Sequence, residues 1–344
     1  MIYRKLGNTT IDVSVICLGT MTYGEQNSEK EAHDQLDFSL DQGVNFIDTA
    51  ELYPVPPKKK TQGLTEEYIG SWLQKSKKRS KIILASKITG PRKDVKYISE
   101  NLGFSKERIM EAIHLSLNRL KTDYLDLYQL HWPERKTNYF GVRGYSKHDD
   151  LWIDNFVEAI GTLETLKQAG KIRHYGLSNE TPWGVHKVIT LARQNGFEVP
   201  VSIQNPYSLL NRLYEVGLAE MSIRENMGLL AYSPLAMGLL TGKYNLGKDS
   251  PADRLNKFNF SRYNKENARI AVQKYYELSK EYDISLTQMS LAFVNQQRFV
   301  TSTIIGATNM TQLKENIASI KMSLDEGLVN KINDIHDMMP NPAP

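Results

Sequence analysis

Two patterns of hydrophobic positions alternate along the chain. Short apolar runs alternate with longer stretches in which apolar residues recur every three or four positions, as on the buried face of a helix. One such face contains Ile109, Ala112, Ile113, Leu117 and Leu120. The short runs predict strands that start at Val15, Val44, Ile82, Leu125, Ile172, Val201, Leu229 and Thr303.

Glycines stand between several predicted helices and the strand that follows. Gly43, Gly170, Gly196 and Gly228 are each predicted to be the left-handed residue of a helix-to-strand loop, because glycine adopts that conformation without steric cost. Strict alternation of strand and helix predicts a parallel sheet of the α/β class. Eight repeats without a change in composition favour a closed (β/α)₈ TIM barrel, formed by residues 1–344 as one domain. An open doubly wound sheet is the alternative.

Three stretches that follow predicted strands are too long to be plain connections, namely 87–105, 132–154 and 235–264. They would rise from the C-terminal face of the barrel, where barrel enzymes build their active sites. Residues 3–13, with Gly7-Asn8 at their centre, predict a β-hairpin ahead of the first barrel strand. That hairpin is placed to close the opposite end.

Composition and charge narrow the class of protein. The 40% hydrophobic and 24% charged residues are ordinary for a globular chain, and the net charge of +4 is dispersed, which argues against a nucleic-acid partner. A single cysteine, Cys17, excludes an internal disulfide and suits a reducing compartment. Without a long apolar run or a signal-peptide pattern, we expect a cytoplasmic protein with no membrane partner.

Polar side chains stand at or just past the ends of the second, third and fourth predicted strands. They are Asp48, Tyr53, Lys87 and His131. Each alone has an ordinary structural explanation: a turn cap, a packed loop residue, a solvated amine and a hydrogen-bonded core histidine. Consecutive barrel strands are neighbours, however, so their joint placement favours one active site.

These four groups suit the donation of a proton to oxygen. A free phenol has a pKa of about 10, and a nearby ammonium favours the phenolate and lowers that pKa. Asp48 would keep Lys87 charged, and a neutral His131 would orient a carbonyl oxygen by a hydrogen bond. The set therefore predicts Tyr53 as a general acid while hydride reaches the carbonyl carbon.

Eight segments carry a resemblance to a known family. They are LGTMTYGEQNSE (18–29), GVNFIDTAELYPVPP (43–57), LASK (84–87), TDYLDLYQLHWP (122–133), GKIRHYGLSNET (170–181), IQNPYSLLNR (203–212), LLAYSPLAMGLLTGKY (229–244) and IIGATNMTQLKEN (304–316). From end to end the chain resembles the aldo-keto reductases, and among them the bacterial Tas-type NADP(H)-dependent branch. The resemblance implies a catalytic tetrad of Asp48, Tyr53, Lys87 and His131.

The chain has neither a Rossmann fingerprint nor a P-loop. The resemblance instead implies an extended NADPH or NADP⁺ across the barrel mouth. Its positions match Ser178, Asn179 and Gln204 for the carboxamide, Tyr232 for the nicotinamide ring, Ser233, Leu235 and Gly238 for the pyrophosphate, and Gly306, Ala307, Thr308, Gln312, Glu315 and Asn316 for the adenosine end. Structural roles are the alternative for single members, such as a strand-end tie for Gln204 or a turn at Gly306.

A preference for NADP over NAD requires cations near the 2′-phosphate. Lys243 and Arg254 are the candidates, with Arg262 as a substitute. Many relatives carry a basic residue just after the turn at Gly306, whereas this chain has Thr308-Asn309.

The sequence thus predicts NADPH-dependent, reversible reduction of aldehydes and ketones, with a small carbonyl compound as partner. An NADPH-binding sensor or regulatory subunit with slow turnover is the alternative. A zinc hydrolase is disfavoured and no metal is expected, because no H-x-H or H-E-x-x-H motif occurs. Specificity is expected from an aromatic wall on the long loops, made of Trp132, Tyr139, Phe140, Trp152 and Trp183.

Overall fold

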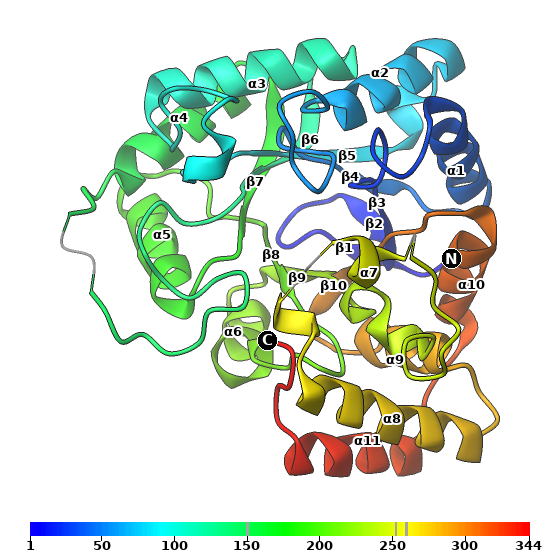
Figure 1. Ribbon diagram of the computed structural model, residues 1–344. Helices are drawn as coiled ribbons and strands as arrows, with labels where there is room; N and C mark the ends of the chain where they lie inside the picture. Colours follow the sequence, from blue (N-terminus) through cyan, green and yellow to red (C-terminus); the bar gives the residue numbers. More distant parts are fainter. Residues whose placement is uncertain (149–150, 252, 259–260) are drawn as a thin grey trace.

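Eight parallel strands close into a barrel in the computed structural model, which describes residues 1–148, 151–251, 253–258 and 261–344 (Figure 1). The order around the barrel is β10-β3-β4-β5-β6-β7-β8-β9. The strands are β3 (Ile16–Gly19), β4 (Phe46–Asp48), β5 (Ile83–Ile88), β6 (Leu125–Leu130), β7 (Ile172–Ser178), β8 (Ser202–Pro206), β9 (Gly228–Tyr232) and β10 (Val300–Ile305). The predicted (β/α)₈ barrel is confirmed, and the open doubly wound alternative is wrong.

Helices surround the barrel, and all but the last two stand between successive barrel strands. They are α1 (Glu29–Asp41), α2 (Leu64–Ser76), α3 (Lys106–Leu120), α4 (Phe156–Gln168), α5 (Pro182–Gln194), α6 (Tyr214–Arg224), α7 (Arg254–Lys257), α8 (Glu266–Glu281), α9 (Leu286–Asn295), α10 (Met310–Ala318) and α11 (Glu326–Met338). Local chemistry fixes their starts: Ser28 and Glu31 form a capping box on α1, and Thr181 caps α5 just before Pro182. No helix in the described part of the chain is long and apolar enough to cross a membrane.

Three of the four predicted glycine stops are left-handed. Gly43, Gly170 and Gly196 have φ values of 83°, 71° and 67°. The prediction for Gly228 is wrong, because Asn226, with a φ of 49°, is the left-handed residue and Gly228 already belongs to β9. Asparagine tolerates that conformation better than most residues. Gly228 is needed for closeness instead, since a Cβ there would lie 1.6 Å from Thr301 Oγ1.

The last barrel strand begins earlier than its apolar run indicates. β10 starts at Val300, and its buried Thr301 and Ser302 hide the strand from a hydrophobicity pattern. Ser302 Oγ donates to the carbonyl oxygen of Ser14 at 2.7 Å, which satisfies the buried hydroxyl.

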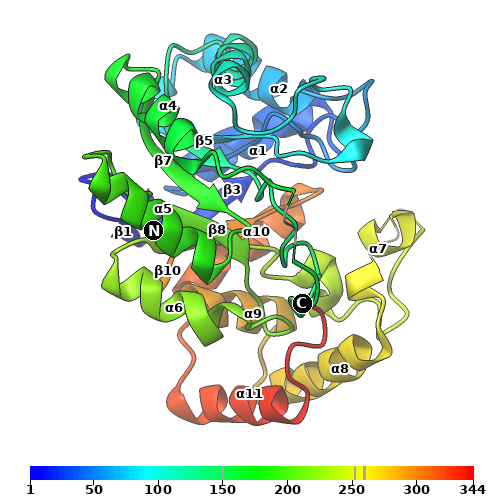
Figure 2. The same cartoon turned by 90° about the vertical axis from the view of Figure 1, so that its left-hand side faces the viewer.

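The predicted hairpin is present and closes the N-terminal end of the barrel. Strands β1 (Tyr3–Lys5) and β2 (Asp12–Ser14) pair antiparallel, and Leu6 between them is fully buried. Leu6 packs in one apolar cluster with Val13, Cys17, Phe46, Ala85, Leu127, Val201, Leu230 and Ile304. Figure 2 shows the hairpin on one side of the barrel and the long loops on the other.

The long loops contain short helices of their own. They are the 3₁₀ turns η2 (Lys93–Val95), η3 (Ala236–Thr241) and η4 (Ser261–Tyr263), together with α7. Two further turns, η1 (Arg79–Lys81) and η5 (Ser319–Lys321), follow α2 and α10. Barrel strands β3 to β10 all run toward the long loops, so residues at their carboxyl ends meet beneath them.

Candidate active site

The structure brings the four predicted catalytic residues together at the carboxyl ends of β4, β5 and β6. Lys87 Nζ donates to Asp48 Oδ2 at 2.6 Å and lies 3.4 Å from the hydroxyl of Tyr53. The rings of Tyr53 and His131 are 5.9 Å apart, edge to face. A phenol, an ammonium, a carboxylate and an imidazole therefore share one small volume.

The Asp48 carboxylate is held on both oxygens. Lys87 occupies Oδ2, while Gln204 Nε2 donates to Oδ1 at 2.8 Å and Gln129 Nε2 does so at 3.3 Å. Lys87 Nζ also donates to the carbonyl oxygen of Thr49 at 2.7 Å. This buried set fixes the ammonium below the tyrosine.

The loop that carries Tyr53 is anchored by a second buried charge, Glu51. One carboxylate oxygen of Glu51 accepts from the backbone N–H of Thr89 at 3.0 Å, and the other pairs with Arg108 of α3. Gln62 Nε2 donates to the carbonyl oxygen of Glu51 at 2.7 Å. Removing one partner of such a buried pair typically costs about 3–5 kcal/mol, so this anchor restrains the tyrosine strongly.

The pKa shifts follow from burial and from neighbouring charges. Burial alone would lower the pKa of Lys87, but the charge of Asp48 and the neighbouring Tyr53 outweigh it and raise that pKa. Burial, together with the positive charges of Lys87 and Arg92, lowers the pKa of His131 well below 6.5, so its imidazole is neutral. The expected charge states of Lys87 and His131 agree with these directions.

The expected direction for Tyr53 is wrong. Lys87 does pull the phenol pKa down, yet burial outweighs it and raises the pKa of Tyr53 above 10. A protonated phenol at neutral pH is the state that a proton donor requires.

A cavity of about 510 Å³ opens above these residues, within the usual range of cofactor and small-molecule sites. All but two of the predicted site residues line it. The lining members are Asp48, Tyr53, His131, Asn179, Gln204, Tyr232, Ser233, Leu235, Gly238, Lys243, Arg254, Gly306, Ala307, Thr308, Gln312, Glu315 and Asn316. Lys87 and Ser178 are outside this lining; both are buried and bonded to lining residues.

Side chains at the ends of β7, β8 and β9 form a connected group on the cavity wall. Ser178 Oγ donates to the carbonyl oxygen of Gln204 at 2.8 Å, and Tyr232 Oη donates to Asn179 Oδ1 at 2.6 Å. Asn179 Nδ2 in turn donates to the carbonyl oxygen of His131 at 2.9 Å. The wall is therefore tied directly to the backbone of His131.

The loop after β9 has an unusual backbone. Ser233, Ala236 and Met237 have φ values of 53°, 48° and 56°, and Gly238 follows at 97°. Left-handed residues other than glycine cost energy and gather at functional sites. A residue of negative φ followed by a left-handed one makes a concave pair of N–H groups that suits an anion, and Leu235 (φ −101°) followed by Ala236 is such a step.

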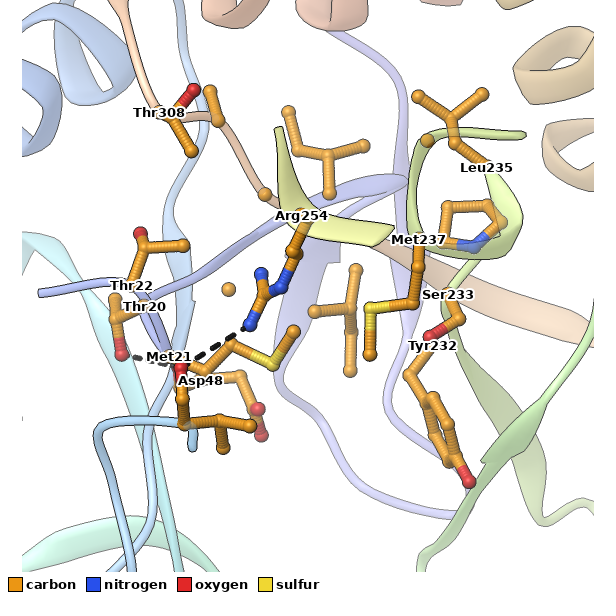
Figure 3. Close-up of a pocket in the computed structure, with 18 of the residues that line it drawn as sticks. Thr20, Met21, Thr22, Asp48, Tyr232, Ser233, Leu235, Met237, Arg254 and Thr308 are labelled. Carbon is orange, nitrogen blue, oxygen red and sulfur yellow. Dashed lines mark hydrogen bonds between the residues drawn. The ribbon is translucent and has the colours of Figure 1, made fainter. Parts of the chain in front are cut away.

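Cationic side chains lie farther along the same loop. Lys243 pairs with Asp253, whereas Arg254 makes one long bond, at 3.4 Å, to the carbonyl oxygen of Val55. Figure 3 shows Arg254 reaching into the cavity between Thr22 and Met237. Burial lowers the pKa of Arg254 to about 10, and its Nε has no hydrogen-bond partner among the described residues. Arg262 also lines the cavity.

The turn between β10 and α10 is organised by its own side chains. Gln312 Oε1 accepts from the backbone N–H of Thr308 at 3.0 Å, and Asn316 Nδ2 donates to the carbonyl oxygen of Gly306 at 3.1 Å. Ser285 Oγ donates to Glu315 Oε1 at 2.8 Å. A Cβ on Gly306 would meet nothing within 4 Å, so the backbone there is open to a ligand.

Several cavity residues were not predicted. Thr20, Met21, Thr22 and Gln26 come from the loop after β3, and Met237 from the loop after β9. The rule that a barrel site collects residues from every strand-to-helix loop could have found the first group, although no single residue there carries a chemical signal.

The predicted aromatic wall is only partly present. Trp132 and Phe140 line the cavity, and Tyr139 packs edge to face on Phe140. Trp152 and Trp183 lie elsewhere, packed around the Arg135 guanidinium that pairs with Glu180. Within the described residues, no group of three or more His, Cys, Asp or Glu is arranged to hold a metal.

Comparison with known proteins identifies the family of this chain. The aldo/keto reductase family model matches residues 15–337, and the chain belongs to that family. Over the full length of both chains it is 48% identical to Protein tas of Escherichia coli (strain K12). It is also 34% identical to the uncharacterized oxidoreductase YrpG of Bacillus subtilis (97% of this chain, 96% of the relative) and 28% identical to norsolorinic acid reductase B of Dothistroma septosporum (96% and 81%). Family and relatives together support an oxidoreductase that acts on carbonyl groups.

Proposed function

We propose that this protein reduces aldehydes and ketones to alcohols with NADPH, and that Tyr53 supplies the proton. The observation that carries this proposal is the buried Asp48–Lys87 pair held 3.4 Å below the Tyr53 hydroxyl at the floor of the cavity. The bound nicotinamide cofactor would supply the hydride. Tyr53 would give its proton to the carbonyl oxygen, and the ammonium of Lys87 would stabilise the phenolate that remains.

Neutral His131 would position the substrate. Its ring stands edge to face against Tyr53, so a carbonyl oxygen accepting from the imidazole would also lie near the phenol. Asp48 would keep Lys87 protonated through the cycle, and the Glu51–Arg108 anchor would keep the phenol in place. The Asp48 carboxylate would thus stabilise the Lys87 ammonium, and the ammonium would in turn stabilise the phenolate of Tyr53.

The residues present fit an extended dinucleotide. The connected wall of Ser178, Asn179 and Gln204 would hold the carboxamide, and Tyr232 would stack on the nicotinamide ring. The left-handed loop after β9 would receive the pyrophosphate. Gly306 and the side chains at the start of α10 would surround the adenosine end.

Two features support a preference for NADPH over NADH. Arg254 is buried in the cavity with an unpartnered Nε, and Lys243 lies on the same loop. A 2′-phosphate would give Arg254 a partner and would share Lys243 with Asp253, and Arg262 is the next candidate if both cations prove dispensable. We also place the protein in the cytoplasm, working as one domain over 1–344, with a small carbonyl compound rather than nucleic acid as its partner.

A direct test uses a panel of aldehydes and ketones, with NADPH oxidation followed by absorbance. Steady turnover of simple aldehydes, lost in Tyr53→Phe while NADPH still quenches protein fluorescence, supports the proposal. An NADPH-binding sensor would bind the cofactor equally well but turn over slowly with every carbonyl. Failure to bind either NADPH or NADH at about millimolar concentration, far weaker than typical cofactor sites, would contradict both functions.

A further inference from the structure

One charged side chain of the cavity lining has no part in the proposed chemistry. Arg92 lies in the loop after β5 and lines the cavity together with Leu52, Trp132 and Phe140. The other Asp, Glu, Lys, Arg and His residues that line the cavity in the described ranges belong to two groups: the proposed catalytic residues Asp48 and His131, and the proposed cofactor site. The second group contains Lys243, Asp253, Arg254, Arg262 and Glu315. Arg92 is thus the cation that a substrate would meet.

The position of Arg92 is built by its neighbours. Its guanidinium carbon lies 5.1 Å from the centre of the Trp132 ring, a cation–π distance. The indole N–H of Trp132 donates to the carbonyl oxygen of Pro91 at 3.3 Å. A Cβ on Gly90 would lie only 2.6 Å from that indole, so glycine allows the loop to press against the ring. Trp132 directly follows His131, which links Arg92 to the catalytic group.

The guanidinium is fixed at one edge and open at the other. Arg92 Nε donates to Asp94 Oδ1 at 2.5 Å, which orients the plane of the group. Neither terminal nitrogen has a hydrogen-bond partner among the described residues, and the side chain is one-third exposed (33%). A stacked guanidinium with a free pair of N–H groups matches the two oxygens of a carboxylate.

From this placement we infer that the preferred substrates are carbonyl compounds that bear a carboxylate, recognised by the free edge of Arg92. The inference rests on the proposed carbonyl reduction and names its substrate class. Leu52, Trp132 and Phe140 would enclose an apolar spacer between the two polar ends. Asp94 shares the single positive charge of Arg92, so the site suits a monoanion better than a phosphate dianion.

The chemistry at the carbonyl is unchanged by this recognition. Hydride adds to the carbonyl carbon and the Tyr53 proton to its oxygen, so the product is a hydroxy acid whose carboxylate takes no part. Arg92 would act on binding and orientation, and its removal should raise KM more than it lowers kcat.

The test compares two substrates of nearly equal shape, 4-carboxybenzaldehyde and its neutral methyl ester, in wild type and in Arg92→Met. Methionine keeps much of the side-chain length but has no charge. We expect kcat/KM for the acid to fall roughly 10- to 100-fold, as for a lost charge-assisted hydrogen bond, while the value for the ester changes little. Arg92→Lys should restore only part of the loss, because an ammonium lacks the fork.

Arg193→Met is the matched control, since Arg193 is an exposed arginine that pairs with Glu225. It should leave both substrates unchanged. Equal losses for acid and ester in Arg92→Met would show that Arg92 only supports Trp132, and equal kcat/KM values in wild type would show that no anion is recognised. Either result overturns the inference while leaving the proposed carbonyl reduction intact.

If wild type reduces neither these two aldehydes nor any carbonyl compound of the panel, the proposed function fails and the anion site is tested by binding alone. Benzoate and benzamide are then titrated into the NADPH-saturated protein, with tryptophan fluorescence as the readout. Tighter binding of benzoate that is lost in Arg92→Met supports carboxylate recognition. Equal binding of the two ligands overturns it.

Discussion

The two ends of the barrel are made by the same strands but differ in character: one end is closed by apolar packing, and the other carries the candidate active site. At the N-terminal end, the inward residues Phe46, Ala85, Leu127 and Leu230 pack with Leu6 of the hairpin in an apolar cluster. Two positions farther along each of these strands stand Asp48, Lys87, Gln129 and Tyr232. The first three form a buried polar group at the base of the cavity, and Tyr232 lies on the cavity wall. Because strand side chains alternate between faces, both sets point inward. A step of two residues along each strand therefore separates residues that pack the core from residues of the candidate active site.

The sharpest contrast is expected from Tyr53→Phe, which keeps the ring and removes the proton. General acid catalysis is worth roughly 10²–10⁴-fold, so turnover of an aldehyde should fall by at least that much. NADPH affinity, measured by fluorescence quenching, and the free energy of unfolding should stay close to wild type. Near-normal turnover would remove Tyr53 from the mechanism and leave His131 as the remaining donor.

At the opposite end, Leu6→Ala should affect stability rather than catalysis. Truncating a fully buried leucine typically costs about 2–5 kcal/mol, through lost transfer energy and the cavity left behind. Urea unfolding measures that loss, and kcat at a temperature where the variant stays folded should equal that of wild type. A large fall in kcat at unchanged folding would show that the two ends are coupled.

Substitutions at Lys243 and Arg254, in the proposed cofactor site, should have a milder effect, chiefly on the affinity for NADPH. Each charge-assisted hydrogen bond that Lys243 and Arg254 would make to a phosphate is worth about 1.5–3 kcal/mol, or roughly 10- to 150-fold in affinity. The double change to alanine should therefore weaken NADPH far more than NADH in a fluorescence titration. Equal losses for both cofactors would move the phosphate site to Arg262.

The smallest effect concerns pH and His131. An unfolded histidine has a pKa of about 6.5, and burial holds the native pKa of His131 well below that value. Below about pH 6.5 the unfolded state binds a proton that the native state does not, so the free energy of unfolding falls with falling pH, by up to roughly 1.4 kcal/mol per pH unit.

In His131→Gln this contribution should be absent. Urea unfolding at about pH 7.5 and about pH 5.5 compares the two proteins, and other titrating groups cancel because both contain them. Wild type should lose more stability on acidification than the variant. Identical pH slopes would mean that His131 takes up a proton in the folded protein.

Strand and helix order was readable from the sequence because burial follows simple periods. The alternation of patterns predicted the closed barrel, and strand ends identified Asp48, Lys87 and His131 before any loop was placed. The same reasoning was wrong at Gly228, where close packing against Thr301 and not backbone conformation requires glycine. It also placed the start of β10 too far along the chain, because the buried hydroxyl of Ser302, which bonds to the backbone, interrupts the apolar pattern of the strand.

Loop paths and net electrostatics were beyond the sequence. Nothing in the order of residues tells that Trp152 and Trp183 enclose Arg135 while Trp132 carries Arg92, because such contacts depend on where long loops settle. The Tyr53 pKa depends on the balance between burial and the charge of Lys87, and only the folded site shows that burial wins.

The single thiol at the closed end can report how often the protein opens. Cys17 is the one cysteine in the sequence and is fully buried among the barrel residues beneath Leu6. Burial also raises the pKa of this thiol, so the native state presents no reactive thiolate to a labelling reagent. Alkylation would then wait for the hairpin or the barrel to open. Its rate would report how often that happens, and a bound ligand at the far end should slow it.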